Sequence, residues 1–294
     1  MSTRPAEAVA GVHRIDPDLR IGAVELGVSD VSASADFYSH ALGLALLARD
    51  ADTVRLGPPQ HDRAALVLHR VRDPVPASPH DTGLFHVAWL HPSRAELAAT
   101  VERLLAQRWP IDGASDHGVS EALYLSDPDG LGIEIYADRP REQWPRTREG
   151  GEIAMFTRPL DVDDLLAQGP SEPTAAVAPA VVVGHVHLKV AHVARAAAFY
   201  RDVLGFTEQA HMPSAAFLAA DGYHHHIGLN SWQSRGAHPA PANAPGLRLL
   251  TFELSDAEAL GELGARLGPV GKGASGELRV SDPDGTRLAF RAQG

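Results

Sequence analysis

Cysteine is absent from the 294-residue chain, which excludes disulfides, thiolate metal ligands and cysteine nucleophiles. Long apolar runs are also missing: the longest, 175–184, contains Pro179 and is too short to cross a bilayer. Residues 1–14 contain no apolar stretch typical of a secretion signal, so we expect a cytoplasmic protein. Basic residues are in the minority, with 26 Lys and Arg against 37 Asp and Glu, and the net charge is −11. This balance disfavours nucleic acid and anionic membranes as partners.

Internal repeats are the strongest feature that is present. Residues 22–44 match 184–206, residues 83–90 match 246–253 in pattern, and SDPDG occurs at 126–130 and again at 281–285. One unit is therefore written twice, as residues 1–138 and 181–294, and a Pro- and Ala-rich linker with a short helix, 139–180, joins the copies.

Each copy divides again into two modules of similar design. An apolar strand at 21–28 is followed by a helix from Asp30 and by strands near 52–57 and 64–70. The next module opens with LFHVAWL, continues with a helix that Ser93 caps, and closes with two strands around SDPDG. The last helix has the same signature at Ser255. The pattern predicts an α+β fold built from four βαβββ modules.

The stretch from Ser115 to Tyr136 contains the most informative single residue. It reads as two strands joined by an Asp-Pro-Asp-Gly turn, and Glu134 lies in the middle of the second, apolar strand. Either Glu134 faces solvent at a sheet edge, or it faces inward and binds a cation, because a buried unpaired carboxylate is costly. We favour the second interpretation.

These modules resemble the vicinal oxygen chelate superfamily, which includes glyoxalases, bleomycin-resistance proteins and extradiol dioxygenases. The segments that carry the resemblance are GLFHVAWLHPSRAEL, DHGVSEALYLSDPDGLGIEIYADRP, GHVHLKV with AFYRDVLGF, and YHHHIGLNSW. The chain is most similar to the two-domain, four-module enzymes of the catechol 2,3-dioxygenase type. The resemblance implies two barrel-like domains, in which pairs of modules form a cup and the metal ligands come from opening and closing strands.

The repeat alignment shows which of those ligand positions this chain has kept. The first copy has His86 and Glu134 where the second has Leu249 and Ala289, and the second has His185 where the first has Ala23. Neither copy is complete, but together they supply two histidines and one carboxylate, a set typical of non-haem Fe(II). The three would converge if the second and third modules shared one barrel, or if two subunits exchanged halves.

Glu25 is a rival third ligand, because it lies two residues beyond Ala23 on the same strand face. With His86 and Glu134 it would give one histidine and two carboxylates within the first copy. That set is similar to a glyoxalase-type isomerase site.

The resemblance also implies acid–base and substrate groups around the metal. It places the tyrosine that hydrogen-bonds the substrate hydroxylate at Tyr124 and a pocket histidine at His117. In the triplet His224–His226 we expect the catalytic base at His225, with His226 as second choice, although strand parity favours His224 and His226. Finally, we expect substrate contacts from His187 and Trp232.

The function that this resemblance implies is extradiol cleavage of a catechol-type ring with Fe(II) and O₂. The partners would be a small aromatic diol and O₂, and the protein would be a homo-oligomer. Ligand types alone leave Mn(II), Zn and Ni open. Two alternatives therefore remain: another metalloenzyme of this fold, an isomerase or lyase, or a metal-free small-molecule binding or resistance protein.

Overall fold

A computed structural model describes residues 13–147, 151, 153–169, 177–178, 180–269, 271–273 and 276–293. The strands of the first half are β1 Arg20–Val28, β2 Ala45–Arg49, β3 Thr53–Gly57, β4 Leu66–Arg70, β5 Gly83–His91, β6 Gly113–Asp116, β7 Ser120–Ser126, β8 Gly132–Asp138 and β9 Arg158–Pro159. The strands of the second half are β10 Val182–Lys189, β11 Thr207–Met212, β12 Ala215–Ala219, β13 Ile227–Asn230, β14 Gly246–Leu254, β15 Gly271–Lys272, β16 Leu278–Ser281 and β17 Arg287–Ala292. The helices are α1 Val31–His40, α2 Arg94–Ala106, α3 Val162–Leu166, α4 Val193–Ala198 and α5 Ala257–Leu267, with a 3₁₀ turn η1 Arg141–Gln143 and a π-helical turn η2 Phe199–Val203.

The helices begin where short polar side chains accept the first unpaired backbone N–H groups. Asp30 accepts from Ser32 and Ala33 at α1, and Ser93 accepts from Glu96 at α2. At α5 the cap is Asp256 rather than the expected Ser255, one residue later in the chain. Among the described residues, no helix combines the length and the apolar character needed to cross a membrane.

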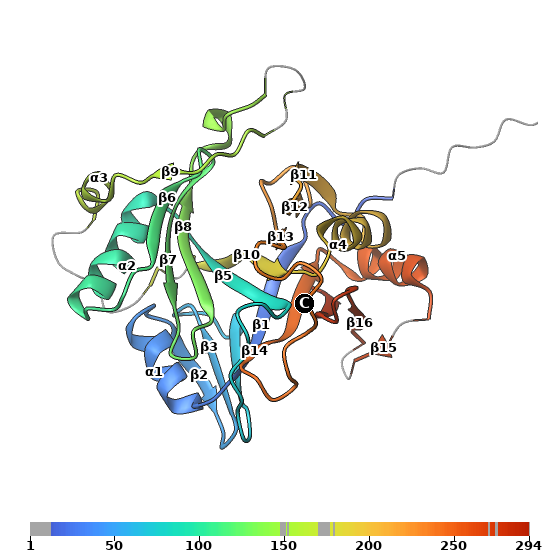
Figure 1. Cartoon of the computed structure of the whole chain (residues 1–294), viewed down its shortest axis with the longest axis horizontal. Coiled ribbons are helices and arrows are strands. Elements are labelled where there is room, and N and C mark those ends of the chain that lie inside the picture. The colour runs from blue at the N-terminus through green and yellow to red at the C-terminus, as the bar shows by residue number, and fades with distance from the viewer. Residues whose placement is uncertain are drawn as a thin grey trace, which may run out of the picture.

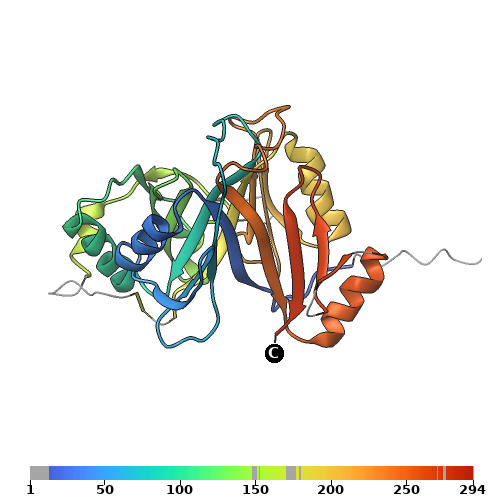
Figure 2. The same cartoon turned by 90° about the horizontal axis from the view of Figure 1, so that it is seen from below.

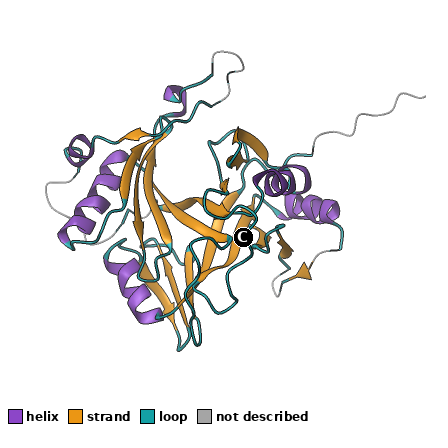
Figure 3. Ribbon diagram, in the orientation of Figure 1, coloured by secondary structure: helices purple, strands orange, loops and turns teal. Residues whose placement is uncertain are grey.

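The strands form two curled sheets, and each sheet contains strands from both halves of the chain (Figures 1 and 3). The order β11-β12-β13-β10-β5-β8-β7-β6-β9 joins the third module to the second through the antiparallel pair β10–β5. The order β15-β16-β17-β14-β1-β4-β3-β2 joins the fourth module to the first through β14–β1. The second and third modules therefore share one sheet.

Alternation along the central strands separates a core face from a cup face. On β5, Val87 and Trp89 belong to the main hydrophobic core, whereas His86 and Ala88 face the other way. In Figure 1, α1 and α2 lie outside the strands on one side of the molecule, and α4 and α5 lie outside them on the other. The concave faces of the sheets are left for side chains that do not pack in the core.

The repeated SDPDG turns link the two modules within each half. Asp127 accepts hydrogen bonds from the backbone N–H groups of Asp129 and Leu131 and from the hydroxyl of Tyr38 in α1. Asp282 makes the same contacts with Asp284, Thr286 and Tyr200. Burial raises the pKa of Asp127 to about 6, against the opposing effect of its backbone hydrogen bonds.

Candidate functional site

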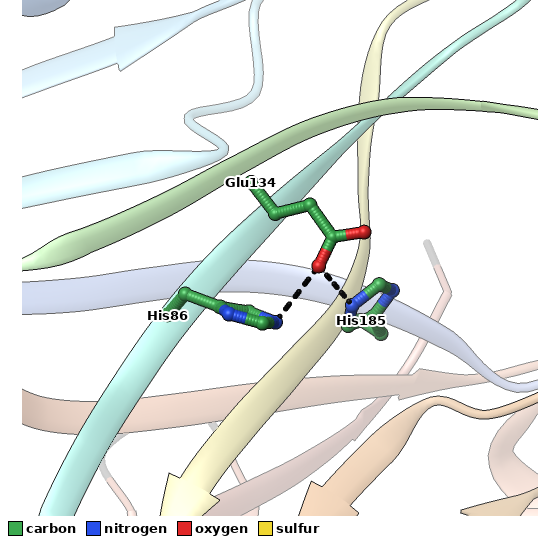
Figure 4. Close-up of side chains that lie close together, drawn as sticks. All are labelled: His86, Glu134 and His185. Carbon is green, nitrogen blue, oxygen red and sulfur yellow. Dashed lines mark hydrogen bonds and ion pairs between the residues drawn. The ribbon is translucent and has the colours of Figure 1, made fainter. Parts of the chain in front are cut away.

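His86, Glu134 and His185 meet on the concave face of the sheet formed by the second and third modules (Figure 4). The Nε2 atoms of His86 and His185 lie 3.0 and 3.3 Å from the same carboxylate oxygen of Glu134. All three side chains are buried, and one candidate ligand atom of each lies within 4.8 Å of the others. The structure thus brings together, in a single chain, residues that lie in both copies of the sequence repeat.

Strand register explains the convergence. Glu134 of β8 pairs with Ala88 of β5, and Ala88 pairs with His185 of β10. The side chains of Glu134 and His185 therefore lie on either side of the small Ala88 side chain. The adjacent row carries Gly132 beside His86. A Cβ atom at Gly132 would lie 2.1 Å from a backbone carbonyl oxygen, so only glycine fits there. Small residues between the functional side chains leave the space that an ion needs.

The donor set fits a divalent metal. Burial opposes ionisation of Glu134, but His185 and His86 hold the pKa of its carboxyl well below the usual range. Burial lowers the pKa of His185 to about 4, so its ring is neutral near pH 7. Two imidazoles and one carboxylate form the donor set of the facial triad.

Hydrogen bonding within the protein does not satisfy these rings. His185 Nδ1 is buried and has no hydrogen-bond partner among the described residues, and His86 Nε2 has only the Glu134 carboxylate beside it. The two ring nitrogens that face the carboxylate are Nε2 of His86 and Nε2 of His185. Two imidazole nitrogens and a carboxylate oxygen this close together in a buried site are atoms that a divalent cation would bind.

Glu25, the rival ligand, belongs to the other cup. It lies on β1 in the eight-stranded sheet, and its carboxylate oxygen is 2.7 Å from Nε2 of His69. The set of one histidine and two carboxylates within the first copy is therefore wrong. Sequence reasoning placed Glu25 on the correct strand face but could not show that the first module pairs with the fourth.

Tyr124 and His117 form one hydrogen-bonded pair beside the triad. Tyr124 lies directly across from Glu134 on the neighbouring strand, and its hydroxyl is 2.7 Å from His117 Nε2. His117 Nδ1 is 3.0 Å from the carbonyl oxygen of Phe156, so it donates there and Nε2 accepts from Tyr124. Burial, together with the charge of Glu134, raises the pKa of Tyr124 and keeps the phenol protonated.

The histidine triplet divides into two roles. His225 is buried, its ring centroid lies 4.0 Å from that of His185, and its Nδ1 is 2.8 Å from Nδ1 of His224. His224 Nε2 is in turn 2.9 Å from a carboxylate oxygen of Asp138. Because the carboxylate can only accept, His224 donates from Nε2 and accepts at Nδ1, which leaves Nε2 of His225 unprotonated.

His226 is not part of this cluster, contrary to its place as the second candidate base. Its Nδ1 accepts the backbone N–H of Ala220 at 3.1 Å, and burial lowers its pKa to about 4. The regular strand β13 begins only at Ile227, which explains why strand parity misplaced the triplet.

His187 and Trp232 lie beside the triad with Phe85. The ring of His187 is buried, lies 5.0 Å from the ring of His86, and carries an Nε2 atom without a partner among the described residues. Trp232 is 52% exposed, and its ring centroid lies 5.3 Å from that of Phe85 and 5.5 Å from that of His187. These rings form an aromatic wall that reaches from the buried ligands to the surface.

A groove of about 1180 Å³ reaches His86 and Tyr124 from the same side of the sheet. Its rim includes two proline-rich segments, 74–79 and 239–245, which meet at one end of the molecule (Figure 2). Val75 donates its backbone N–H to the carbonyl of Asn243 at 3.1 Å and holds the two segments together. The volume is ample for a small aromatic substrate.

Asp138 is the site residue that sequence reasoning missed. It is the last residue of β8, and its carboxylate binds both His224 and the hydroxyl of Tyr223 at 2.9 Å. The same hydroxyl is 2.9 Å from that of Tyr136, whose ring packs against His185. Asp138 lies four residues after Glu134 on the same strand face, and this spacing was the sequence signal that could have placed it at the site.

Comparison with known proteins agrees with this architecture. The model of the Glyoxalase/Bleomycin resistance protein/Dioxygenase superfamily matches residues 20–135 and 182–290. A catechol-2,3-dioxygenase of Bacillus subtilis (strain 168) is 40% identical over 283 residues, which span 94% of this chain and 98% of that protein.

Two solved structures share the fold. A putative dioxygenase from Bacillus subtilis subsp. subtilis str. 168 has a TM-score of 0.65 at 13% identity, over 95% of this chain and 86% of that one. Glyoxalase I from Zea mays has a TM-score of 0.55 at 17% identity, over 93% and 92%. The chain therefore belongs to the glyoxalase/bleomycin resistance/dioxygenase superfamily and is a homologue of catechol-2,3-dioxygenase.

Proposed function

We propose that the protein is an extradiol dioxygenase that cleaves a catechol-type ring next to its diol, using Fe(II) and O₂. The observation that carries the proposal is the buried set His86, Glu134 and His185, with donor atoms within 4.8 Å of one another. The 40% identity to a catechol-2,3-dioxygenase over nearly the whole chain supports the same chemistry.

The three side chains of the set would hold the iron on one face and leave the opposite face for diol and O₂. When bound, the iron supplies the Lewis-acid and redox chemistry that joins the two substrates. The protein holds the ligands on three adjacent strands, β8, β5 and β10, so their geometry is set by sheet register rather than by loops.

His225 is the proposed base for the first hydroxyl proton of the diol. Its Nδ1–H is engaged by His224, so the lone pair of Nε2 is the available acceptor. Burial and the neighbouring His185 lower the pKa of His225 well below the usual range, which keeps the ring unprotonated before the substrate binds. Asp138 fixes the tautomer of His224 and, through it, that of His225.

Tyr124 is the proposed partner of the deprotonated diol oxygen. Its phenol stays protonated, and His117 already orients the hydroxyl next to the triad. A hydrogen bond from the phenol would stabilise the anionic oxygen in this buried setting. The aromatic wall of Phe85, His187 and Trp232 would align the ring and exclude water.

Oxygen uptake and product analysis test the proposal. The protein is first loaded with Fe(II) in the absence of oxygen. When catechol and O₂ are then added, it should consume one O₂ per catechol, and both atoms of labelled O₂ should appear in a yellow semialdehyde acid. Glu134→Gln should abolish the reaction, whereas Glu25→Gln, in the other cup, should retain it. Catechol turnover without oxygen uptake, or activity with zinc or nickel alone, would contradict the proposal.

A further inference from the structure

The first and fourth modules form a second curled sheet (Figure 1). The concave face of this sheet is a second cup, and its floor has small side chains in place of the histidine and the glutamate of the first cup. Ala23 and Ala289 occupy the positions of His185 and Glu134, and Thr251 lies beside Ala289 as Ala88 lies beside Glu134. These small residues leave a cavity of about 390 Å³.

Arginines line the walls of this cavity at positions that are aromatic in the first cup. Arg279 lies across from Ala289 just as Tyr124 lies across from Glu134. Arg55 lies across from Val67 at the register position of Phe217, which contacts His187 and His225 in the first cup. Arg63 and Arg291 complete the lining, and Arg287 lies at an adjoining hollow of about 260 Å³.

The nearby carboxylates are already paired and are fewer than the arginines. Glu25 binds His69, Glu277 binds Arg279, and Glu253 binds Arg291. Arg55 has no hydrogen-bond or ion-pair partner among the described residues. Five arginines and two glutamates line the cup, and Glu253 lies against Arg63 and Arg291. In a chain of net charge −11, this is a local reversal of sign.

We infer that this second cup binds a small carboxylate ligand with a short apolar body. Guanidinium groups present two parallel N–H donors that match a carboxylate, and all the cationic lining residues are arginine rather than lysine. Ala23, Val67 and Leu249 provide an apolar floor for the body of the ligand, and the cavity volume suits a single-ring acid. The site is separate from the histidine cup and does not depend on ring cleavage.

Titration calorimetry with benzoate tests this inference. The protein is titrated in the Glu134→Gln background, free of metal, so that carboxylate cannot bind iron in the first cup. Benzamide serves as the neutral probe and inorganic phosphate as the second anion. Arg55→Gln with Arg279→Gln removes two cup cations, and Arg72→Gln removes an arginine that is 82% exposed, pairs with Asp52 and does not line the cavity. Thermal melting checks that each variant folds.

We expect benzoate to bind saturably to the parent and to Arg72→Gln, and at least about tenfold more weakly to the double variant. Benzamide should bind at least about tenfold more weakly than benzoate, because it lacks the charge. Equal affinity of the parent and the folded double variant for benzoate would overturn the assignment. So would equal binding of benzamide, binding of phosphate without benzoate, or no saturable binding of benzoate.

Discussion

The replacement Glu134→Gln separates a metal site from a buried ion pair. In the protein without metal, glutamine keeps the volume and hydrogen-bonding capacity of Glu134 and removes a carboxylate that lies 3.0 and 3.3 Å from two imidazole nitrogens. In the protein with metal, it removes one of three ligands and the only charged one. The two interpretations therefore predict different responses to added metal.

The expected magnitude follows from linkage. A ligand present at about 1,000 times its Kd stabilises the folded state by about 4 kcal/mol. For a chain of this size, each kcal/mol moves Tm by about 2–4 °C, so saturating Mn(II) or Fe(II) should raise the wild-type Tm by on the order of 10 °C. The Glu134→Gln variant should lose nearly all of this gain, and so should His185→Ala, which lies in the other copy of the repeat.

The assay is scanning calorimetry without oxygen, with and without metal. Glu25→Gln is the matched control, because Glu25 also lies against a histidine, 2.7 Å from His69, but in the cup without ligands. It should keep the full metal-dependent shift. In the absence of metal, His86→Ala should cost about 3 kcal/mol, more than Glu134→Gln, since it leaves a buried carboxylate with fewer partners. A wild type without a metal-dependent shift, or a Glu134→Gln variant that shifts equally, would refute the metal site.

Three further changes test the surrounding groups. Asp138→Asn should lower kcat by about 100-fold with little change in KM, because His225 loses its fixed tautomer; steady-state kinetics that show only a KM effect would argue against the relay. Tyr124→Phe should lower kcat by about 10- to 100-fold by removing the hydroxyl that His117 orients, and unchanged kinetics would exclude this role. Asp127→Asn tests stability. Because burial raises the folded pKa to about 6 from 3.8, this carboxyl favours folding most below about pH 4. The free energy of unfolding of the wild type, measured in urea relative to that of the variant, should therefore fall by about 2 kcal/mol between about pH 4 and pH 7. A pH-independent difference would contradict this assignment.

The fold and the grouping of His86, Glu134 and His185 in one buried cluster could largely be predicted from the sequence. Glu134 was informative because a carboxylate in an apolar strand needs a partner. The repeat alignment then placed His86 and His185 at the positions where the resemblance expects metal ligands. The sequence did not decide whether the second and third modules of one chain share a sheet or whether two subunits exchange halves. Strand pairing across the linker depends on packing between distant segments. Glu25 was ambiguous for the same reason.

The hydrogen-bond network could not be predicted from local pattern. Asp138 reaches His224 across 86 positions in the chain. Its spacing from Glu134 places Asp138 on the cup face but does not show which histidine it contacts. The triplet was also misleading because period-2 alternation applies only to regular strands, and β13 begins after His226. Predictions from alternation hold along β5, β8 and β10 and fail at the triplet, just before β13 begins.

His86 and Glu134 lie in the first copy of the repeat and His185 lies in the second, and this has a physical consequence for how the site assembles. β5 and β10 lie on opposite sides of the linker, yet their antiparallel pairing places His185 one row from His86. The cup therefore exists only after the two halves of the chain have associated, and a metal held by His86, Glu134 and His185 would bridge that association. Binding energy for the ion would then favour the paired halves over the separated ones. The cup of the first and fourth modules lacks these three side chains, and it carries Arg279 and Arg55 at the register positions of Tyr124 and Phe217.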